Sequence, residues 1–233
     1  MVTTMSNTPA ADQNNHIKDP RLARLISLWT VSEETQDSLQ SCRTYEEYED
    51  VVSRCALSCS SHTTDSFHRF YGMQRFIPAG ILVKLALEVI YPMCRVDRGM
   101  FFELLAKALV KESPAEKAER EEYVYDRLKD HIKLNGRVTL YRGATSLNYK
   151  PTSAISYTLS REKAEWFKNR NQLFGGTDGV VIEKDFPLSK ILWYTDCRKE
   201  QEVIVESPYL RRLINQAMIS NNRPLREEKK LVC

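Results

Sequence analysis

The spacing of apolar residues changes near Gly136, and this change constrains the fold more than any other feature of the chain. From Asp19 to about Leu134, apolar residues recur at i, i+3, i+4 and i+7, the period of amphipathic helices. After Gly136, apolar and polar residues alternate, the period of half-buried strands. Because helices come first and strands second, the sequence predicts an α+β fold, with an N-terminal helical lobe followed by a mainly antiparallel β core.

Local signals mark the beginnings of several helices. Asp19 before Pro20 is typical of an N-cap followed by proline at the first helical position. Capping boxes, in which a hydroxyl residue is followed three residues later by Glu, start at Thr44 and at Ser113. We expect the helix that begins after Ser113 to end before Gly136. Further helices are expected at about 78–89 and 98–111.

The second part of the chain alternates in five short segments. The expected strands cover 138–142, 154–158, 180–183, 191–194 and 202–207. A short helix capped by Ser160 lies between the second and third strands, and a last helix begins at Pro208. The expected organisation is a disordered tail at 1–18, a helical lobe at 19–136, a β core at 137–220 and a charged tail at 221–233.

Composition and missing motifs exclude several classes of protein. The net charge is only +3, which is too mild for a dedicated nucleic-acid binder. The longest apolar run, 76–83, is far shorter than the ~20 residues that span a bilayer, so we expect no membrane segment. The sequence contains no glycine-rich phosphate loop, no G-x-S-x-G elbow and no H-E-x-x-H motif. We therefore expect no Rossmann or P-loop site, no α/β-hydrolase chemistry and no zinc hydrolase.

The cysteines favour a reducing compartment. The chain has six cysteines and no C-x-x-C pair, and Cys55 and Cys59 lie on an apolar helical stripe, where core packing is the simplest role. We expect no metal site. The N-terminus carries no secretory signal of the usual kind, so a cytoplasmic location is the default expectation. Delivery into another cell by a dedicated machine would leave no trace in the sequence.

Charged and hydroxyl side chains recur in a fixed order within the β core. Arg142 ends one expected strand, Ser156 and Thr158 lie on the next, and Glu200 and Glu202 enter the last. Alternation along a strand would place both glutamates on one side, about 6.6 Å apart. An arginine can hold a phosphate bidentately, and a carboxylate can stabilise an oxocarbenium-like sugar. The set would suit cleavage of a glycosidic bond in a diphosphate nucleotide.

These segments resemble mono-ADP-ribosyltransferases of the cholera-toxin-like group. The similarity covers 137–207, with 14 residues from Arg142 to Ser156 and 46 from Ser156 to Glu202. The order matches the Arg, Ser-Thr-Ser and Glu-x-Glu signatures of that family, in which a helical lobe normally precedes the arginine strand. The middle signature departs from the family, because it has Tyr157 and Thr158 where the family has Thr and Ser.

The resemblance implies an ADP-ribosyltransferase fold and a role for each matched residue. NAD would be the substrate, and Arg142 would bind its phosphate. Ser156 would hold the cleft open and position Glu202, which would stabilise the ribose as nicotinamide leaves. Glu200 would face the acceptor, a protein arginine. The residues implied in binding NAD are Arg142, Gly143, Ser156, Thr158 and Glu202.

Two loops receive a role from the same resemblance. The segment 194–199 would recognise the target protein, and 169–178 would be a mobile loop over the nicotinamide end of NAD.

Three alternatives stay open at this point. An NAD glycohydrolase would use the same residues with water as acceptor. A catalytically inactive interaction module would place the function in the helical half, although two carboxylates in one cleft repel each other and argue against it. A nucleic-acid binder has only scattered Lys and Arg in its favour.

Overall fold

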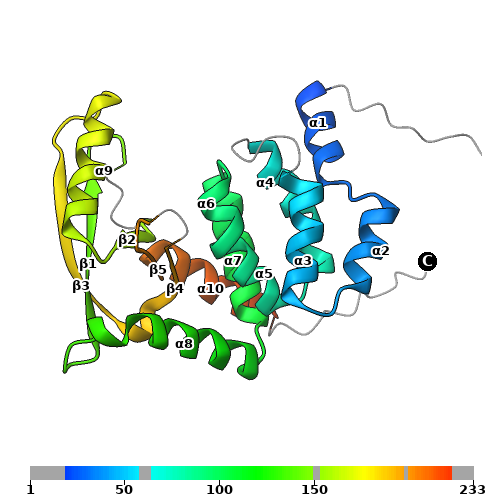
Figure 1. Ribbon diagram of the computed structural model, residues 1–233. Coiled ribbons are helices and arrows are strands. Elements are labelled where there is room, and N and C mark those ends of the chain that lie inside the picture. Colours follow the sequence, from blue (N-terminus) through cyan, green and yellow to red (C-terminus); the bar gives the residue numbers. More distant parts are fainter. Residues whose placement is uncertain (1–18, 58–63, 149–152, 197–198, 222–233) are drawn as a thin grey trace, which may run out of the picture.

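The computed structural model describes residues 19–57, 64–148, 153–196 and 199–221. It combines a helical lobe with a five-stranded antiparallel sheet, as the change of period predicts (Figure 1). The tail expected at 1–18 and almost all of the charged tail expected at 221–233 lie outside the described residues.

Most of the helices precede the sheet. Those of the helical lobe are α1 (Pro20–Trp29), α2 (Glu33–Ser41), α3 (Tyr45–Val52), α4 (Thr64–Met73), α5 (Ala79–Leu85), α6 (Tyr91–Met93) and α7 (Arg98–Lys111). Helix α8 (Pro114–Leu128) follows and leads to the sheet, against whose strand β4 (Ile191–Thr195) it packs. Two more helices are α9 (Arg161–Leu173) and α10 (Pro208–Asn221).

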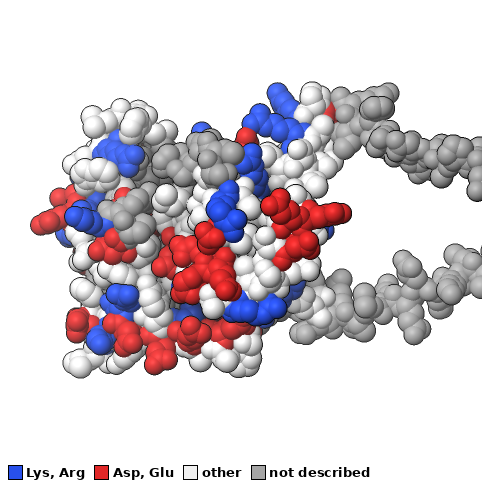
Figure 2. All heavy atoms as spheres, turned by 45° about the vertical axis from the view of Figure 1, so that its right-hand side comes forward, with Lys and Arg blue, Asp and Glu red and all other residues white. Residues whose placement is uncertain are grey.

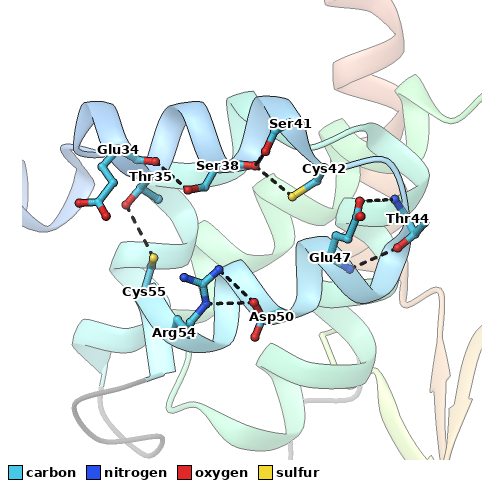
Figure 3. Close-up of polar contacts among 10 residues, drawn as sticks. All are labelled: Glu34, Thr35, Ser38, Ser41, Cys42, Thr44, Glu47, Asp50, Arg54 and Cys55. Atoms are coloured by element: carbon cyan, nitrogen blue, oxygen red, sulfur yellow. Dashed lines mark hydrogen bonds and ion pairs between the residues drawn. The ribbon is translucent and has the colours of Figure 1, made fainter.

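The capping signals of the sequence act as expected. Asp19 caps α1, and full capping boxes form at Thr44 with Glu47 and at Ser113 with Glu116. Figure 3 shows the first of these boxes, in which the Glu47 carboxylate accepts a hydrogen bond from the Thr44 backbone N–H group. The same carboxylate also accepts a hydrogen bond from the Arg43 backbone N–H group. These bonds favour the ionised carboxylate and lower the pKa of Glu47.

Three helices end earlier than the sequence indicates. The helix after Ser113, expected to stop at Asn135-Gly136, ends at Leu128 and is followed by a 3-10 turn at Lys129–His131. The stripe from Thr44 to Cys59 becomes α3 and a π-helical turn at Ser53–Leu57, and the stripe expected at 78–89 becomes α5 and a π-helical turn at Ala86–Ile90. Cys59 lies outside the described residues, and the Cys55 thiol contacts the Thr35 hydroxyl at 3.6 Å (Figure 3). Helices α2 and α4 have no counterpart in the sequence-based prediction.

The sheet places distant segments side by side. Its other strands are β1 (Arg137–Ala144), β2 (Ser156–Thr158), β3 (Val180–Pro187) and β5 (Glu202–Val205). The order is β3-β1-β2-β5-β4, and every neighbouring pair is antiparallel. β2 and β5 are shorter than the strands expected at 154–158 and 202–207, whereas β1 and β3 are longer than expected.

The described residues form two apolar cores. The larger core contains most of the helical lobe together with Ile204 of β5 and Trp193 of β4, so one face of the sheet packs against the helices. The smaller core joins α8 to the opposite side chains of the strands, including Val203 and Val205. Helix α10 packs mainly against α7 and so returns the end of the described chain to the helical lobe.

Surface charge is mixed. Figure 2 shows patches of both signs on one face of the molecule, without a continuous basic surface. Among the helices of the described ranges, none has the length and apolarity required to cross a bilayer. Within the same ranges, no group of three or more His, Cys, Asp or Glu side chains is arranged to hold a metal ion.

Candidate functional site

Three neighbouring strands bring the predicted site residues together. Arg142 lies near the end of β1, Ser156 begins β2 and Glu202 begins β5. β2 pairs with β1 on one side and with β5 on the other, with Thr158 opposite both Tyr141 and Glu202. Residues that are 14 and 46 positions apart in the sequence therefore meet across adjacent strands.

Hydrogen bonds connect these three residues directly. The Ser156 hydroxyl donates a hydrogen bond to the Glu202 carboxylate oxygen Oε1. The Arg142 guanidinium donates through Nη1 to the Ser156 backbone carbonyl at 2.6 Å. Glu202 is only 7% exposed, so it is buried. A buried carboxylate held by a hydroxyl has a defined orientation, which a preorganised electrostatic site needs.

The connected residues line one open cavity of about 420 Å³. Its walls come from β1, β2, the residues just before and at the start of β5, and helix α9. The lining residues that the sequence predicts are Arg142, Gly143, Ser156, Thr158, Glu200 and Glu202.

Arg142 places a positive charge in the wall of this cavity. Burial lowers the pKa of its guanidinium, but an arginine keeps its charge in proteins even so. The guanidinium carbon lies 6.0 Å from the centre of the Tyr157 ring. A half-buried cation with a fixed geometry can bind a phosphate or carboxylate of a ligand.

Glu200 does not lie on a strand, and the alternation argument for it is wrong. β5 begins only at Glu202, and both Lys199 and Gln201 have positive φ values, of 56° and 48°. The segment before β5 is therefore a turn, in which the Thr158 hydroxyl donates to the Glu200 carbonyl at 2.7 Å. The Gln201 N–H also donates to the Asp196 carboxylate at 2.9 Å. Glu200 reaches the same cavity as Glu202 through this turn.

Gly143 has a packing role that the sequence did not indicate. A Cβ at this position would lie 2.0 Å from the Ala164 carbonyl oxygen and 2.5 Å from the Lys168 nitrogen, both in the backbone of α9. Only glycine lets α9 approach β1 this closely. Gly143 therefore sets the position of the cavity wall that α9 forms.

The prediction of a loop at 169–178 is partly wrong. Its first residues belong to α9, which ends at Leu173, and only the remainder is a turn with Gly175 at φ 89°. Gly176 is a close-approach glycine, because a Cβ there would lie 2.5 Å from the Thr145 hydroxyl. In the segment 194–199, residues 194 and 195 belong to β4, and 197–198 lie outside the described residues.

The helical lobe contributes a tyrosine that sequence patterns did not reveal. Tyr91 of α6 lies near the Ser156–Glu202 pair, and its pKa is raised to about 12, first by burial and then by the negative charge of Glu202. The positive charges of Arg142 and Arg98 and a hydrogen bond with the Ser156 side chain act in the opposite direction. Tyr91 therefore stays protonated at neutral pH as a polar neighbour of the site.

Other lining residues also lack a sequence signal. Asn148, Phe167 and Asn171 line the cavity. Asn148 lies in a turn after β1, where its side-chain oxygen accepts a hydrogen bond from the Thr145 N–H at 2.7 Å. The two α9 residues lie one helical turn apart and face the sheet. Their placement depends on the docking of α9 on β1, which no local motif encodes.

Comparisons with known proteins assign no family to the chain. Comparisons of the chain with protein-family models, with curated protein sequences and with solved structures find no match.

Proposed function

We propose that the protein is a mono-ADP-ribosyltransferase that transfers ADP-ribose from NAD to a macromolecular acceptor, a protein arginine, and releases nicotinamide. The observation that carries the proposal is the hydrogen-bonded connection of Arg142, Ser156 and Glu202 in one cavity. The resemblance of their segments to the Arg, Ser-Thr-Ser and Glu-x-Glu signatures supports the same conclusion.

The proposed chemistry breaks the glycosidic bond between nicotinamide and ribose. Nicotinamide leaves with the bonding electron pair, and positive charge develops on the ribose. Arg142 would hold the diphosphate, while the Glu202 carboxylate, oriented by the Ser156 hydroxyl, would stabilise the developing charge. A guanidinium nitrogen of the acceptor then forms the new bond to the ribose, and Glu200 accepts the proton that this nitrogen loses.

Incubation with NAD labelled in the ADP-ribose part tests the proposal. We expect release of free nicotinamide and label on a protein. Glu202→Gln keeps the size of the side chain but removes its charge, and should slow nicotinamide release by about 10²- to 10³-fold. Glu206→Gln is the matched control, because Glu206 follows the same strand but pairs with Lys190 and Arg211 outside the cavity.

Two further variants separate the residue roles. Arg142→Lys should also lose activity, because an ammonium cannot reproduce the two-pronged contact of a guanidinium with a phosphate. Glu200→Ala should lose arginine modification but keep NAD hydrolysis. An equal loss of both activities in Glu200→Ala would contradict the role given to Glu200.

The alternatives correspond to other outcomes of the same assay. Free ADP-ribose with no labelled macromolecule would identify an NAD glycohydrolase. No nicotinamide release with any acceptor would favour an inactive interaction module built on the helical lobe.

A further inference from the structure

Helix α9 carries a row of exposed aromatic and cationic side chains on the side that faces away from the sheet. Trp166 is 52% exposed and Phe174 is 72% exposed. The Arg170 guanidinium carbon lies between them, 5.3 Å from the Trp166 ring centre and 6.0 Å from the Phe174 ring centre. Large exposed rings cost solvation free energy, so a row of them indicates a surface that a partner covers. We call this row, together with Lys163 and Leu173, the α9 stripe.

Among the residues that the structure describes, the two cations of the α9 stripe, Lys163 and Arg170, have no acidic partner. Arg161 pairs with Glu165 and Glu183, but neither Lys163 nor Arg170 forms an ion pair with any carboxylate of the described residues. Both lie on the same helix face as Trp166, at spacings of three and four residues. The stripe therefore presents unpaired positive charges beside apolar rings.

The α9 stripe is continuous with the wall of the cavity. The Trp166 ring packs edge-on against Phe167, with ring centres 4.9 Å apart, and Phe167 lines the cavity. A molecule that covers the stripe would therefore lie beside the cavity and could place a side chain in it.

We propose that the α9 stripe docks the acceptor protein through a segment that carries carboxylates and apolar side chains next to the modified arginine. This inference rests on the proposed function and adds the chemistry that would select the acceptor. Carboxylates would pair with Lys163 and Arg170, while apolar side chains would cover Trp166, Leu173 and Phe174.

The charge pattern favours a protein over a nucleic acid or a membrane. Exposed Glu162 and Glu165 interrupt the cations along the same helix, and a nucleic-acid backbone or an anionic bilayer would bring phosphates against both. Separate carboxylates on a peptide can meet the two cations and avoid the two glutamates.

Two synthetic peptides test the proposal, each with a single arginine. One flanks the arginine with Glu and Leu, and the other flanks it with Lys and Leu. We expect the native full-length protein to modify the acidic peptide about three- to tenfold more efficiently, measured as kcat/KM, since exposed ion pairs are individually weak. The preference should shrink at high salt.

Charge reversal provides the decisive variant. Lys163→Glu combined with Arg170→Glu should invert the preference, while NAD hydrolysis in the absence of peptide stays unchanged because neither residue lines the cavity. Lys111→Glu combined with Arg212→Glu is the matched control on α7 and α10, with the same change in charge and no expected effect on preference. An unchanged preference in the α9 double variant would overturn the inference.

A binding assay separates this inference from the proposed function. Fluorescence anisotropy of the labelled acidic peptide should show binding that the α9 double variant loses, whether or not NAD is cleaved. If nicotinamide release fails but this binding is present, the proposed chemistry is wrong and the docking surface stands. Tighter binding of a single-stranded oligonucleotide or of phosphatidylserine vesicles than of the peptide, lost in the same variant, would assign the stripe to another partner and refute the proposal.

Discussion

Signals between residues close in the sequence specify much of the helical lobe, whereas contacts between residues far apart in the sequence form the site in the sheet half. Helices α3 and α8 begin at capping boxes that involve residues three positions apart. The cavity of the sheet half depends on contacts such as that of Ser156 with Glu202, which are 46 positions apart. Elements that local hydrogen bonds specify can be found from the sequence, whereas a site assembled across strands needs the fold before its geometry exists.

The largest expected change in the free energy of unfolding comes from two core substitutions, which also test whether the helical lobe and the sheet half unfold together. Leu105 of α7 and Leu140 of β1 are both fully buried, one in each apolar core. Replacing either by alanine should lower the free energy of unfolding by about 2–5 kcal/mol. Because the helical core includes Ile204 and Trp193 of the sheet, we expect a single unfolding transition in both variants, measured by urea titration with circular dichroism. Two separate transitions would mean that the halves are independent units.

Two glycines, one in the sheet half and one in the helical lobe, allow a second comparison, with smaller expected changes in stability. In Gly143→Ala the new Cβ would clash with the backbone of α9, so stability should fall by about 1–3 kcal/mol and the cavity wall should shift. The control is Gly99→Ala in α7, where a Cβ would meet only an Asp97 oxygen, at 3.5 Å. There, stability should stay the same or rise by up to about 1 kcal/mol. Thermal unfolding measures both, and equal effects would show that α9 can move away from β1 without cost.

Much of the helical lobe could be predicted because its signals are local. The missed helices show the limit of this information. Helix α2 buries only Leu39, so it has no apolar stripe to detect, and its N-cap Ser32 lacks the glutamate of a capping box. The π-helical turns after α3 and α5 were also unpredictable, since the apolar stripe continues through them while the backbone changes its hydrogen bonding.

The identities of the candidate site residues could be predicted better than their placement. Arg142, Ser156 and Glu202 do lie in one cavity, as the resemblance implies. Glu200 reaches it from a turn, because the positive φ of Gln201 interrupts the expected alternation. Tyr91 could not be found, since its position depends on how the helical lobe packs against the sheet.

Tyr91 is the point where the helical lobe meets the candidate site. Tyr91→Phe removes the hydroxyl that interacts with Ser156 and keeps the ring that packs against Phe101, whose centre is 5.2 Å away. The loss of this polar neighbour of the site, about 1 kcal/mol, should slow nicotinamide release about fivefold. Tyr209→Phe is the control, because Tyr209 packs against Phe102 in the same core. If both variants keep full activity while Glu202→Gln does not, the helical lobe supports the site by packing alone.

The smallest expected change in stability concerns the Glu116 carboxylate, which connects α8 with α5. Glu116 accepts hydrogen bonds from the backbone N–H of Ser113, at 2.7 Å, and of Gly80 in α5, at 3.1 Å. These bonds lower its pKa in the folded protein relative to the unfolded chain. Its ionised form therefore stabilises the fold above the unfolded pKa, and this contribution disappears as the pH falls through the folded pKa.

Glu116→Gln keeps a hydrogen-bonding side chain but removes the charge at the N-terminus of α8. At neutral pH the variant should be less stable by about 0.3–1 kcal/mol, and the difference should vanish in acid, because the native carboxylate is then protonated as well. Glu47→Gln in the box of α3 is the control, since within the described ranges the Glu47 carboxylate accepts hydrogen bonds only from Arg43 and Thr44, next to its own helix. Urea titrations at a series of pH values should give the larger pH-dependent difference for Glu116. An equal difference for the two residues would mean that the bond to Gly80 adds nothing, and that the link between α5 and α8 depends on apolar packing instead.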